Sequence, residues 1–341
     1  MILVTGTFPP ERCGVADYSA RLLETKTAQK AGWKLLHTKD VRTSAIFKVI
    51  KEVKQMNDNE INIQYPSRGY INSILPHLLC IYLRLFTRKK ISTTIHEYTQ
   101  LGWKGRLATN IFLICSHKLF FTNPFERDAA IKAVSGVAKN NAIIKIYSNI
   151  PTSKNIKPLS ERKYDVGYFG YIRPEKGIEE FIQVLGQVKK ANPSVKAYIL
   201  GQTLPDLQDY AKQIFDAAKK AGIELLGSKP DDETADILAD TKIGYLPLPD
   251  GLSERRGSFL AYVKNKAIIV ANDGPFVSDY LRSYFLIVSS SREGREELLH
   301  ILASSVNEQE KEQKNVITYA EKELPSSWDD VVECYLNELN K

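Results

Sequence analysis

The feature that most constrains the fold is a regular alternation of short β-prone runs with amphipathic helical patterns. In the first half, the β-prone runs lie at Ile2–Thr5, Lys34–Thr38, Ile61–Gln64, Thr93–His96, Leu119–Thr122 and Ile143–Tyr147. Helical patterns separate them near residues 15–30, 43–56, 71–87, 104–116 and 125–135. Strands that alternate with helices form parallel sheets that are covered by helices on both faces. The sequence therefore predicts an α/β fold.

The alternation stops once and then begins again. Residues 147–160 contain two prolines and several polar residues without an apolar period, as expected of a linker. Further β-prone runs follow near residues 165–170, 195–200, 223–226, 242–246, 267–271 and 285–288. We predict two Rossmann-like domains, residues 1–150 and 151–325, whose sheets face a cleft. A C-terminal helix over residues 326–341 is predicted to pack back on the first domain.

Composition is that of a globular protein: 341 residues, of which 43% are hydrophobic and 26% charged. The cysteines Cys13, Cys80, Cys115 and Cys334 are scattered and form no CxxC pair, so we expect reduced thiols rather than a zinc site. The sequence shows neither a signal peptide nor a run of about 18 apolar residues. We expect a cytoplasmic protein that carries no metal or cofactor.

Charge is distributed unevenly between the two halves. Residues 1–150 hold 22 Lys and Arg against 10 Asp and Glu, a net charge of +12. Residues 151–341 hold 25 against 30, a net charge of −5. A basic half indicates an anionic partner, which can be nucleic acid, lipid headgroups or phosphorylated small molecules. No nucleic-acid-binding module is recognisable, so we expect no nucleic acid.

One segment of the basic half, residues 75–90, is strongly apolar and ends in Arg-Lys-Lys. This pattern is typical of a buried helix with a solvated end. It is also compatible with peripheral attachment to an anionic membrane surface. The second interpretation would place the protein at the inner face of the membrane.

Residues 164–181 combine a β-prone run with the start of an amphipathic helix. Gly170 and Gly177 lie between the two, and Arg173 and Lys176 lie close to the junction. The start of a helix offers unpaired backbone N–H groups and a positive potential, and two nearby cations would complete a cradle for a phosphate. An ordinary βα turn with solvated cations shows the same pattern.

A second stretch, residues 246–263, follows another predicted strand and enters a helix near Gly257. Adjacent arginines on a loop are often only solvated, but those of this stretch precede a predicted helix start. Two such stretches at the same edge of one predicted sheet indicate a diphosphate site. The candidate residues of the second stretch are Ser253, Glu254, Arg255, Arg256, Gly257 and Ser258.

The first half offers two further candidates, Gly14 and His96. Gly14 begins the first predicted helix, where the lack of a side chain would let a ligand approach the backbone, although turn geometry alone also explains a glycine. His96 ends the fourth predicted strand, at the edge where parallel sheets bind ligands. A histidine that is merely bonded within its loop is the alternative. The GxGxxG, P-loop and nucleophile-elbow patterns are absent.

Taken together, these residues resemble the GT-B glycosyltransferases of family 4 along nearly the whole chain. The similar segments are Val4-Thr-Gly-Thr-Phe-Pro-Pro10 with Cys13-Gly-Val-Ala-Asp-Tyr18, Asn62-Ile-Gln-Tyr-Pro66, Ile95-His-Glu-Tyr98, Ser148-Asn-Ile-Pro151, Phe169-Gly-Tyr-Ile-Arg-Pro-Glu-Lys-Gly177, and the run from Pro249 to Asn272. The resemblance implies a nucleotide-sugar donor held mainly by the second domain. It also implies metal-independent hexosyl transfer with retention at the anomeric carbon. In this resemblance, Lys176 would contact the departing diphosphate, His96 the donor sugar, and Gly14 the phosphates.

The chain departs from the family pattern at two places. The family commonly has an arginine directly after the glycine that matches Gly170, where this chain has Tyr171, and Arg173 is the expected substitute. The family also commonly has two glutamates eight positions apart, which here fall on Leu252 and Leu260. An Arg-Arg-Gly-Ser loop nearby is similar to that of one branch of the family.

We therefore expect a retaining glycosyltransferase of surface polysaccharide synthesis. Its donor would be linked to UDP or GDP, and its acceptor would be a glycan or a polyprenyl-diphosphate-linked glycan. Two alternatives remain, a GT-B-fold sugar-nucleotide epimerase or hydrolase, and a non-catalytic subunit that binds a sugar nucleotide. The missing glutamate pair favours the second of these alternatives.

Overall fold

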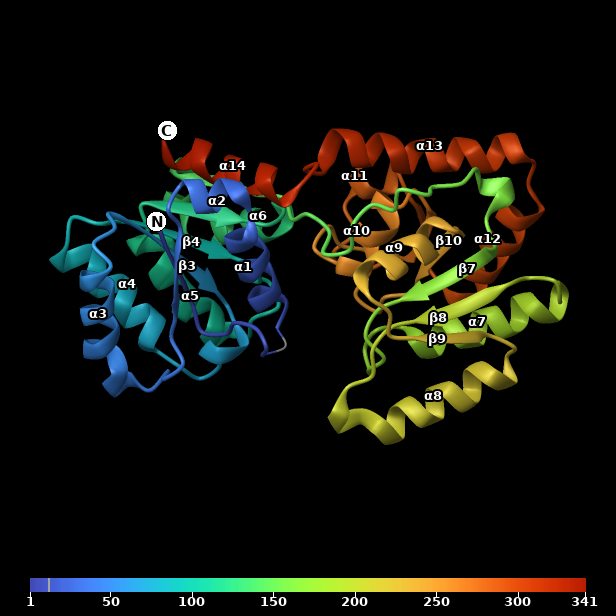
Figure 1. Cartoon of the computed structure of the whole chain (residues 1–341), viewed down its shortest axis with the longest axis horizontal. Helices are drawn as coiled ribbons and strands as arrows, with labels where there is room; N and C mark the ends of the chain where they lie inside the picture. The colour runs from blue at the N-terminus through green and yellow to red at the C-terminus, as the bar shows by residue number, and fades with distance from the viewer. Residues whose placement is uncertain (12) are drawn as a thin grey trace. The chain divides into compact units, whose positions relative to one another are not determined.

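The computed structural model describes residues 1–11 and 13–341, which form two compact units. Unit 1 comprises Met1–Tyr147 and Pro325–Lys341, and unit 2 comprises Ser148–Leu324. Each unit contains a six-stranded parallel sheet flanked by helices (Figure 1). The predicted α/β architecture with two Rossmann-like units is confirmed.

The sheet of unit 1 has the strand order β2-β1-β3-β4-β5-β6. Its strands are β1 (Ile2–Thr5), β2 (Lys34–His37), β3 (Glu60–Tyr65), β4 (Lys90–Ile95), β5 (Lys118–Phe121) and β6 (Asn141–Ile143). The order reverses between β1 and β3. The strand predicted at Ile143–Tyr147 is wrong, because β5 ends at Phe121 and pairs that residue with Ile143, so the ladder lies over Asn141–Ile143.

The helices of unit 1 are α1 (Gly14–Glu24), α2 (Lys26–Lys30), η1 (Thr43–Ala45), α3 (Ile46–Gln55), η2 (Arg68–Tyr70), α4 (Leu75–Phe86), α5 (Trp103–Cys115), α6 (Pro124–Ala133), η3 (Ser135–Lys139) and α14 (Trp328–Leu339). The single helix predicted over residues 15–30 is interrupted at Thr25. The Thr25 hydroxyl accepts a hydrogen bond from the backbone N–H of Ala28 and so caps α2.

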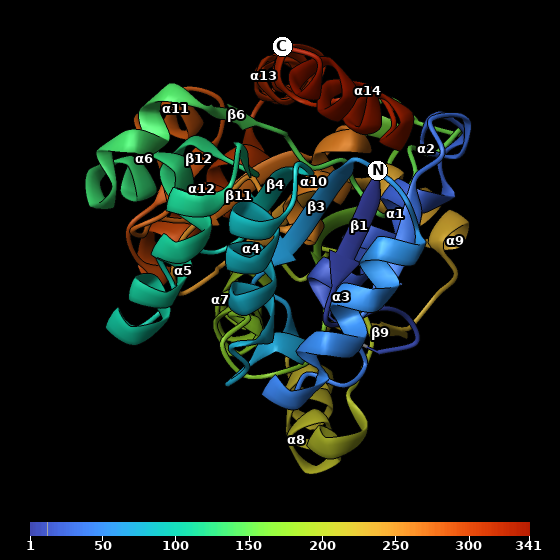
Figure 2. The ribbon, with the colours of Figure 1, turned by 90° about the vertical axis from the view of Figure 1, so that its left-hand side faces the viewer.

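Alternation along β3 divides the interior of unit 1 into two layers. Ile61 and Ile63 point into a core shared with α3, α4 and α5, which lie side by side on that face (Figure 2). The other face of the sheet is covered by α1, α2 and α14. There Tyr335 of α14 packs its ring on Phe120 of β5, with ring centroids 4.6 Å apart. The last helix of the chain thus completes the core of unit 1.

The sheet of unit 2 has the strand order β12-β11-β10-β7-β8-β9, which is the Rossmann order and reverses between β7 and β10. Its strands are β7 (Tyr164–Phe169), β8 (Ala197–Leu200), β9 (Glu224–Gly227), β10 (Thr241–Leu246), β11 (Ile268–Asn272) and β12 (Leu286–Val288). Its helices are η4 (Leu159–Glu161), α7 (Ile178–Ala191), η5 (Pro205–Leu207), α8 (Gln208–Lys220), α9 (Asp231–Ala239), α10 (Gly257–Lys264), α11 (Asp279–Arg282), α12 (Ser291–Ala303) and α13 (Val306–Glu323).

The helices of unit 2 also form two layers. Helices α7, α8 and α12 bury their apolar sides on one face of the sheet, together with Ile243 and Tyr245 of β10. On the opposite face, Gly244 of β10 leaves room for the ring of Tyr262 in α10, because a Cβ at Gly244 would lie 2.7 Å from that ring. Period-two burial along the strands therefore positions both helix layers.

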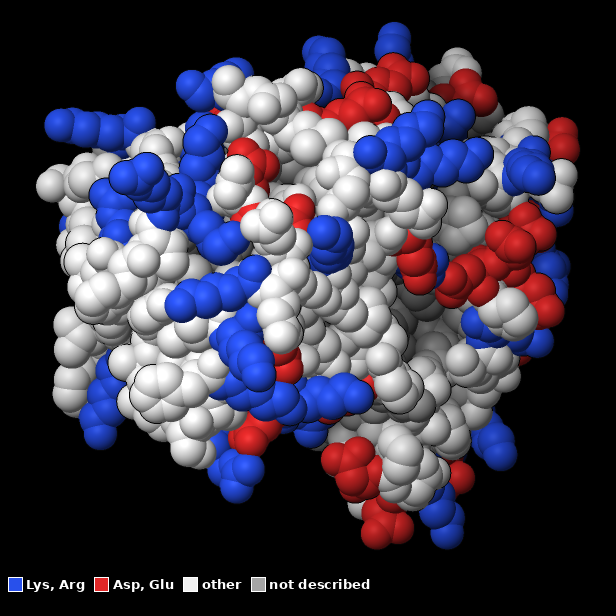
Figure 3. All heavy atoms as spheres, turned by 60° about the vertical axis from the view of Figure 1, so that its left-hand side comes forward, with Lys and Arg blue, Asp and Glu red and all other residues white. Residues whose placement is uncertain are grey.

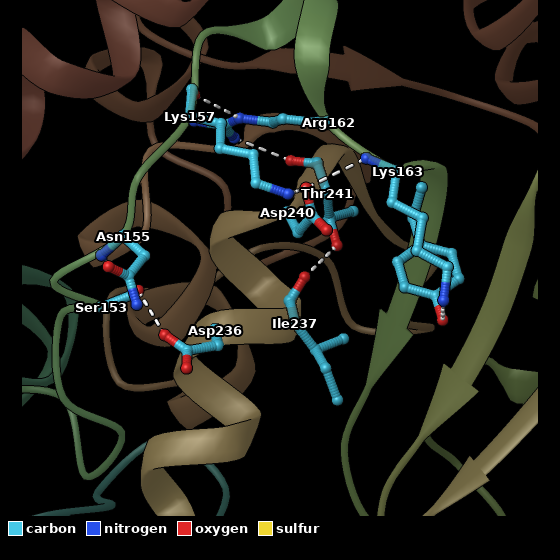
Figure 4. A network of polar contacts seen from close by, with 10 residues as sticks. Ser153, Asn155, Lys157, Arg162, Lys163, Asp236, Ile237, Asp240 and Thr241 are labelled. Carbon is cyan, nitrogen blue, oxygen red and sulfur yellow. Dashed lines mark hydrogen bonds and ion pairs between the residues drawn. The ribbon is translucent and has the colours of Figure 1, made fainter.

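The segment that enters unit 2 is fixed by a network of polar contacts (Figure 4). The buried Arg162 donates to the backbone carbonyls of Lys157 at 3.1 Å, Thr241 at 2.8 Å and Lys266 at 3.0 Å. Lys157 also forms an ion pair with Asp240 at 2.9 Å. Burial lowers the pKa of Arg162 to about 10, and the three carbonyls accept hydrogen bonds from its Nε and Nη1. Much of the segment predicted to be a linker is thus held by unit 2.

Candidate functional site

The loop over residues 170–177 connects β7 to α7 at the point where the strand order of unit 2 reverses. Gly177, the N-cap of α7, has a φ of +71°, and a Cβ at this position would lie 1.7 Å from the carbonyl oxygen of Pro247. Only glycine fits both the backbone conformation and the contact. The start of α7 therefore lies directly against the loop that follows β10.

The first turn of α7 is locked to the carboxyl ends of two strands by a carboxylate. Glu180 accepts hydrogen bonds from the Tyr245 hydroxyl at 3.4 Å and from Nδ2 of Asn272 at 3.0 Å. Burial and the nearby Glu180 carboxylate raise the pKa of Tyr245, so the phenol remains a proton donor. Sequence reasoning missed these three residues, although the Glu-Glu pair in the first turn of a predicted helix was a usable signal.

The two cations of this loop lie at the carboxyl end of β7 in different surroundings. Arg173 is exposed, whereas Lys176 is half-buried. The backbone of Lys176 is held because the Tyr168 hydroxyl donates to its carbonyl oxygen at 3.3 Å. Gly170 begins the loop, and its N–H donates to the carbonyl of Leu200 at 3.1 Å.

The loop over residues 247–256 connects β10 to α10 and carries the second set of predicted residues. Arg256 forms an ion pair with both carboxylate oxygens of Asp250. The guanidinium of Arg255 lies over the ring of Phe276, 5.1 Å from its centroid. The structure thus turns the adjacent arginines to different partners. Asp250 and Phe276 were not identified from the sequence, because both contacts arise from loop folding.

Ser253 and Glu254 are also held within unit 2. Ser253 is buried, and its carbonyl accepts a hydrogen bond from the N–H of Arg256 at 3.0 Å. The Glu254 carboxylate accepts from the Tyr319 hydroxyl of α13 at 3.0 Å, and burial together with Glu254 raises the pKa of Tyr319. The loop is therefore attached to a helix layer of its own unit.

Helix α10 begins with Gly257 and Ser258, and its N-terminus is open. Gly257 is exposed, and within the described part of the chain no atom lies within 4 Å of the position that a Cβ would take there. No side chain among those residues caps the helix at Arg256. Uncapped N–H groups at a helix start are suited to an anion.

The two leucines at the positions of the expected glutamates are part of the core. Leu252 is 0% exposed and Leu260 is 1% exposed. Neither side chain can hydrogen-bond a ribose or a sugar hydroxyl. Any such contact in this chain requires other residues of the two loops.

In unit 1, Gly14 is the first residue of α1 and is exposed. Among residues 1–11 and 13–341, no atom lies within 4 Å of the position that its Cβ would take. One turn later on the same helix, the buried Tyr18 packs edge-on against His96, with ring centroids 5.0 Å apart. Gly14 and His96 are therefore linked through α1.

His96 follows β4 and is only 6% exposed. Its Nε2 lies 2.8 Å from Oε1 of Gln64, and Nε2 of Gln64 donates to Oδ1 of Asn62 and, at 3.3 Å, to Oγ1 of Thr94. Because the Gln64 amide nitrogen is engaged in these contacts, its oxygen faces the ring, so the His96 Nε2 carries the proton.

The same network extends to the C-terminal helix. The Thr94 hydroxyl lies 2.8 Å from the hydroxyl of Tyr335, which lies 2.9 Å from that of Tyr18. Burial raises the pKa of Tyr335 to about 12, although its hydroxyl contacts lower it. Sequence reasoning did not predict this network. The alternating polar residues Asn62 and Gln64 on a buried strand were a signal that could have indicated it. Its closure by α14 was not readable from the sequence.

Two further observations bear on the chemistry. Among the residues that the structure describes, no group of three or more His, Cys, Asp or Glu is placed to hold a metal ion. Across the same residues, the helices are all too short or too polar to cross a bilayer.

The family described as Glycosyl transferases group 1 matches residues 149–323, which span the whole of the site in unit 2. The chain belongs to this family. A comparison with curated proteins found no match.

Solved structures of the same architecture match most or all of the chain. HepE of Anabaena in complex with UDP superposes with a TM-score of 0.74 at 14% identity, over 99% of this chain and 99% of that one. An E. coli structure described as trehalose-6-phosphate bound with UDP-2-fluoro glucose gives 0.69 at 13% identity, over 100% and 99%. A variant of S. aureus TarM in complex with Fondaparinux, alpha-GlcNAc-glycerol and UDP gives 0.59 at 16% identity, over 86% and 58%. At these identities the likeness concerns the fold.

Proposed function

We propose that the protein is a retaining, metal-independent hexosyltransferase. It moves a sugar from a UDP- or GDP-linked donor to a glycan or a polyprenyl-diphosphate-linked acceptor during surface polysaccharide synthesis. The observation that carries this proposal is the contact between the 170–177 and 247–256 loops, made at Gly177 and Pro247. It brings the starts of α7 and α10, with their cations, to one edge of the unit 2 sheet, where Rossmann folds bind nucleotides.

The electrostatics of this edge suit a leaving diphosphate. When the bond between the anomeric carbon and the phosphate oxygen breaks, negative charge develops on the nucleoside diphosphate, and fixed cations and helix N-termini stabilise it without reorganising. We assign this role to Lys176 and Arg173, with Arg255 and Arg256 from the second loop. Arg256 would exchange its Asp250 carboxylate for a phosphate oxygen.

The remaining donor contacts are assigned by residue type and surroundings. Gly170, Gly257 and the hydroxyl of Ser258 lie in or next to the open loop edges, and Ser253 and Glu254 support the second loop from within unit 2. The resemblance assigns Gly14 to the phosphates and His96 to the donor sugar. The contact between Nε2 of His96 and Gln64 fixes the orientation of the ring beside Tyr18.

The net charge of residues 1–150 and the free cysteine thiols support a proposal for the acceptor and for the compartment in which the reaction takes place. The net charge of +12 over residues 1–150 suits a phosphorylated lipid acceptor and contact with an anionic membrane surface. All four cysteines are free thiols, as expected in a reducing compartment. We therefore propose that unit 1 serves the acceptor, unit 2 holds the donor, and the reaction takes place in the cytoplasm at the inner membrane face.

The role of Lys176 is tested by substitution. We expect K176A to lower the transfer rate about 100-fold, the usual effect of removing one group that stabilises developing charge. K176R should recover part of the rate, because it restores the charge. The control is the exposed Lys190 near the end of α7, the helix that follows Lys176. K190A should leave the transfer rate unchanged. A K176A protein that transfers sugar at the full rate would contradict the diphosphate assignment.

The donor is identified by thermal shift with UDP, GDP, ADP and their sugars, since a ligand that binds the native state raises the melting temperature. Anomeric configuration of the product by NMR tests retention, and a transfer rate that survives EDTA tests metal independence. Donor conversion without an acceptor would instead indicate an epimerase or hydrolase. Donor binding without any turnover would indicate a binding subunit.

A further inference from the structure

Helix α5 is apolar on the side that faces away from the core. Trp103 is 73% exposed, Leu107 64% and Ile114 67%. Their spacing of four and seven residues places them in one row along the helix, opposite the buried Phe112. An ordinary surface helix carries polar residues in this row.

The neighbouring helix α4 also exposes large apolar side chains, at its N-cap and at its end. Leu79 and Leu83 are buried in the core of unit 1, whereas Leu85 is 68% exposed, Phe86 71% and Ile74, the N-cap, 55%. Helices α4 and α5 pack against each other and lie in front of the sheet in Figure 2. We call this surface the α4–α5 face and define it by Ile74, Leu85, Phe86, Trp103, Leu107 and Ile114.

The α4–α5 face is framed by cations and almost free of acids. Residues 61–125 contain eight Lys and Arg and a single acidic residue, Glu97. Exposed Arg84 and Arg88 lie at the end of α4, and exposed Lys104 and Arg106 lie at the start of α5. Figure 3 shows Lys and Arg side chains among uncharged surface over this part of unit 1.

The start of α5 combines these features in one place. An open hollow there is lined by Leu101, Gly102, Trp103, Arg106, Leu107 and Asn110. The ammonium of Lys104 lies 5.5 Å from the centroid of the Trp103 ring. Tryptophan next to lysine and arginine is the composition that proteins place at the boundary between headgroups and acyl chains.

We propose that the α4–α5 face docks on an anionic lipid bilayer, with its exposed apolar side chains at the acyl boundary and its cations among the headgroups. A second copy of the chain fits the face less well, because a symmetric contact would bring the two basic surfaces together. Both helices keep their buried sides in the core of unit 1, so the protein lies on the bilayer without inserting a helix across it.

This proposal deepens the proposed function, on which it rests for its purpose: a transferase with a lipid-linked acceptor gains from being held at the surface where that acceptor lies. The docking itself is a property of unit 1. It can therefore be measured without turnover, and its failure is distinguishable from a failure of the proposed activity.

The test is co-sedimentation of the full chain with vesicles of phosphatidylcholine alone or with one quarter phosphatidylglycerol. We expect binding to the anionic vesicles, at least tenfold weaker binding to the neutral ones, and weakening by 0.5 M salt. Brominated lipids should quench tryptophan emission, because Trp103 is exposed while Trp33 and Trp328 lie in or against the core of unit 1.

Three variants separate the contributions. The double variant W103S/L107S should lose at least tenfold in affinity for anionic vesicles, and K104E should lose affinity in the same direction. V306S changes an exposed apolar residue of unit 2, 49% exposed, and should bind as the parent does. The thermal shift given by the donor nucleotide should be the same in all four proteins.

Two results would overturn the proposal. The first is equal binding of the parent and the double variant to anionic vesicles, with no quenching by brominated lipids. The second is a concentration-dependent dimer in sedimentation velocity that W103S/L107S abolishes while the parent binds no vesicles, which would make the face a contact between copies.

Discussion

Units 1 and 2 share an architecture but present different chemistry at the carboxyl edge of their sheets. In unit 2 the edge carries ion pairs, such as those of the mostly buried Arg256 with Asp250 and of the more exposed Arg282 with Asp273. In unit 1 it carries buried hydrogen bonds that connect His96 to Tyr335, and a buried carboxylate, Glu126, that accepts from the backbone N–H groups of Tyr98 and Thr99. One layered fold thus supports either kind of site, and the side chains at the strand ends decide which.

The physical reason lies in the cost of burying charge. A buried hydroxyl or amide needs only hydrogen-bond partners, whereas a buried ion needs a partner and still loses its hydration. Unit 1 can therefore bury its network beneath α1 and α14. Unit 2 pairs the mostly buried Arg256 with Asp250, and it leaves Arg173 exposed, where a phosphate can reach it. Three predictions sharpen this comparison.

The largest effect is expected at the contact between the two loops of unit 2. G177A places a methyl group against the Pro247 carbonyl at a φ of +71°, and we expect a loss of about 3 kcal/mol in the stability of unit 2. Hydrogen exchange of amides in β7 and β10 should rise, while exchange in unit 1 should stay the same.

The control for this substitution is in the same helix. Gly186 lies inside α7, and a Cβ there would lie 3.5 Å from Cβ of Ala221, an ordinary contact. G186A should stabilise unit 2 by about 0.5–1 kcal/mol. If G177A exchanged no faster than G186A, the close approach of the loops would be disproved.

A smaller effect is expected from removing one buried hydroxyl in each unit. Y335F removes the hydroxyl that Tyr18 and Thr94 contact, and Y198F removes the one that Thr241 and Tyr262 contact. Each should cost about 1–2 kcal/mol in urea unfolding. Only the unit 1 network continues to His96.

Kinetics therefore distinguish the two tyrosines. Y335F should change the KM for the donor, since it loosens the groups that orient His96, whereas Y198F should leave KM and kcat unchanged. Equal kinetic effects of the two variants would mean that the network of unit 1 is only structural. That outcome would contradict the proposed functional difference between the buried hydrogen-bond networks of unit 1 and unit 2.

The smallest effect is expected on the stability of unit 1 at acidic pH. His77 of α4 is 4% exposed and packs between the rings of Tyr65 and Phe112, and burial lowers its pKa below the ordinary value. Below about pH 6.5, His77 of the unfolded chain binds a proton, whereas His77 of folded unit 1 resists protonation. The contribution of His77 to the free energy of unfolding of unit 1 is therefore complete above that pH and decreases as the pH falls. The slope is at most about 1.4 kcal/mol per pH unit for one proton.

The measurement compares urea unfolding at pH 7.5 and 5.5 for the parent and H77L, with hydrogen exchange to follow each unit. The parent should lose up to about 1–2 kcal/mol more in unit 1 than H77L does over this range. Unit 2 contains one histidine, His300, which is exposed, and serves as an internal reference. An identical pH dependence in the two proteins would show that His77 is not a buried neutral group.

Sequence reasoning located most strands and helices because period and propensity are local. It failed at the end of unit 1, where pairing with β5 rather than local preference places β6 at Asn141–Ile143. It also missed the break at Thr25, where one hydroxyl caps a new helix. For the candidate site, it identified the two loops of unit 2 but not Glu180, whose partners lie on two strands, or Asp250, whose ion pair with Arg256 depends on how the loop folds.

By itself, the sequence determined the alternation of strands and helices, and with it an α/β protein with two Rossmann-like units. It also determined that the 164–181 stretch turns from a strand into a helix start with two cations nearby, because turns and helix starts depend on neighbouring residues. Only the tertiary structure decided which groups meet: Gly177 against Pro247, Arg256 with Asp250, and the C-terminal Tyr335 in the network of His96. Such contacts depend on strand order, helix packing and loop folding, and they leave little trace in the local sequence pattern.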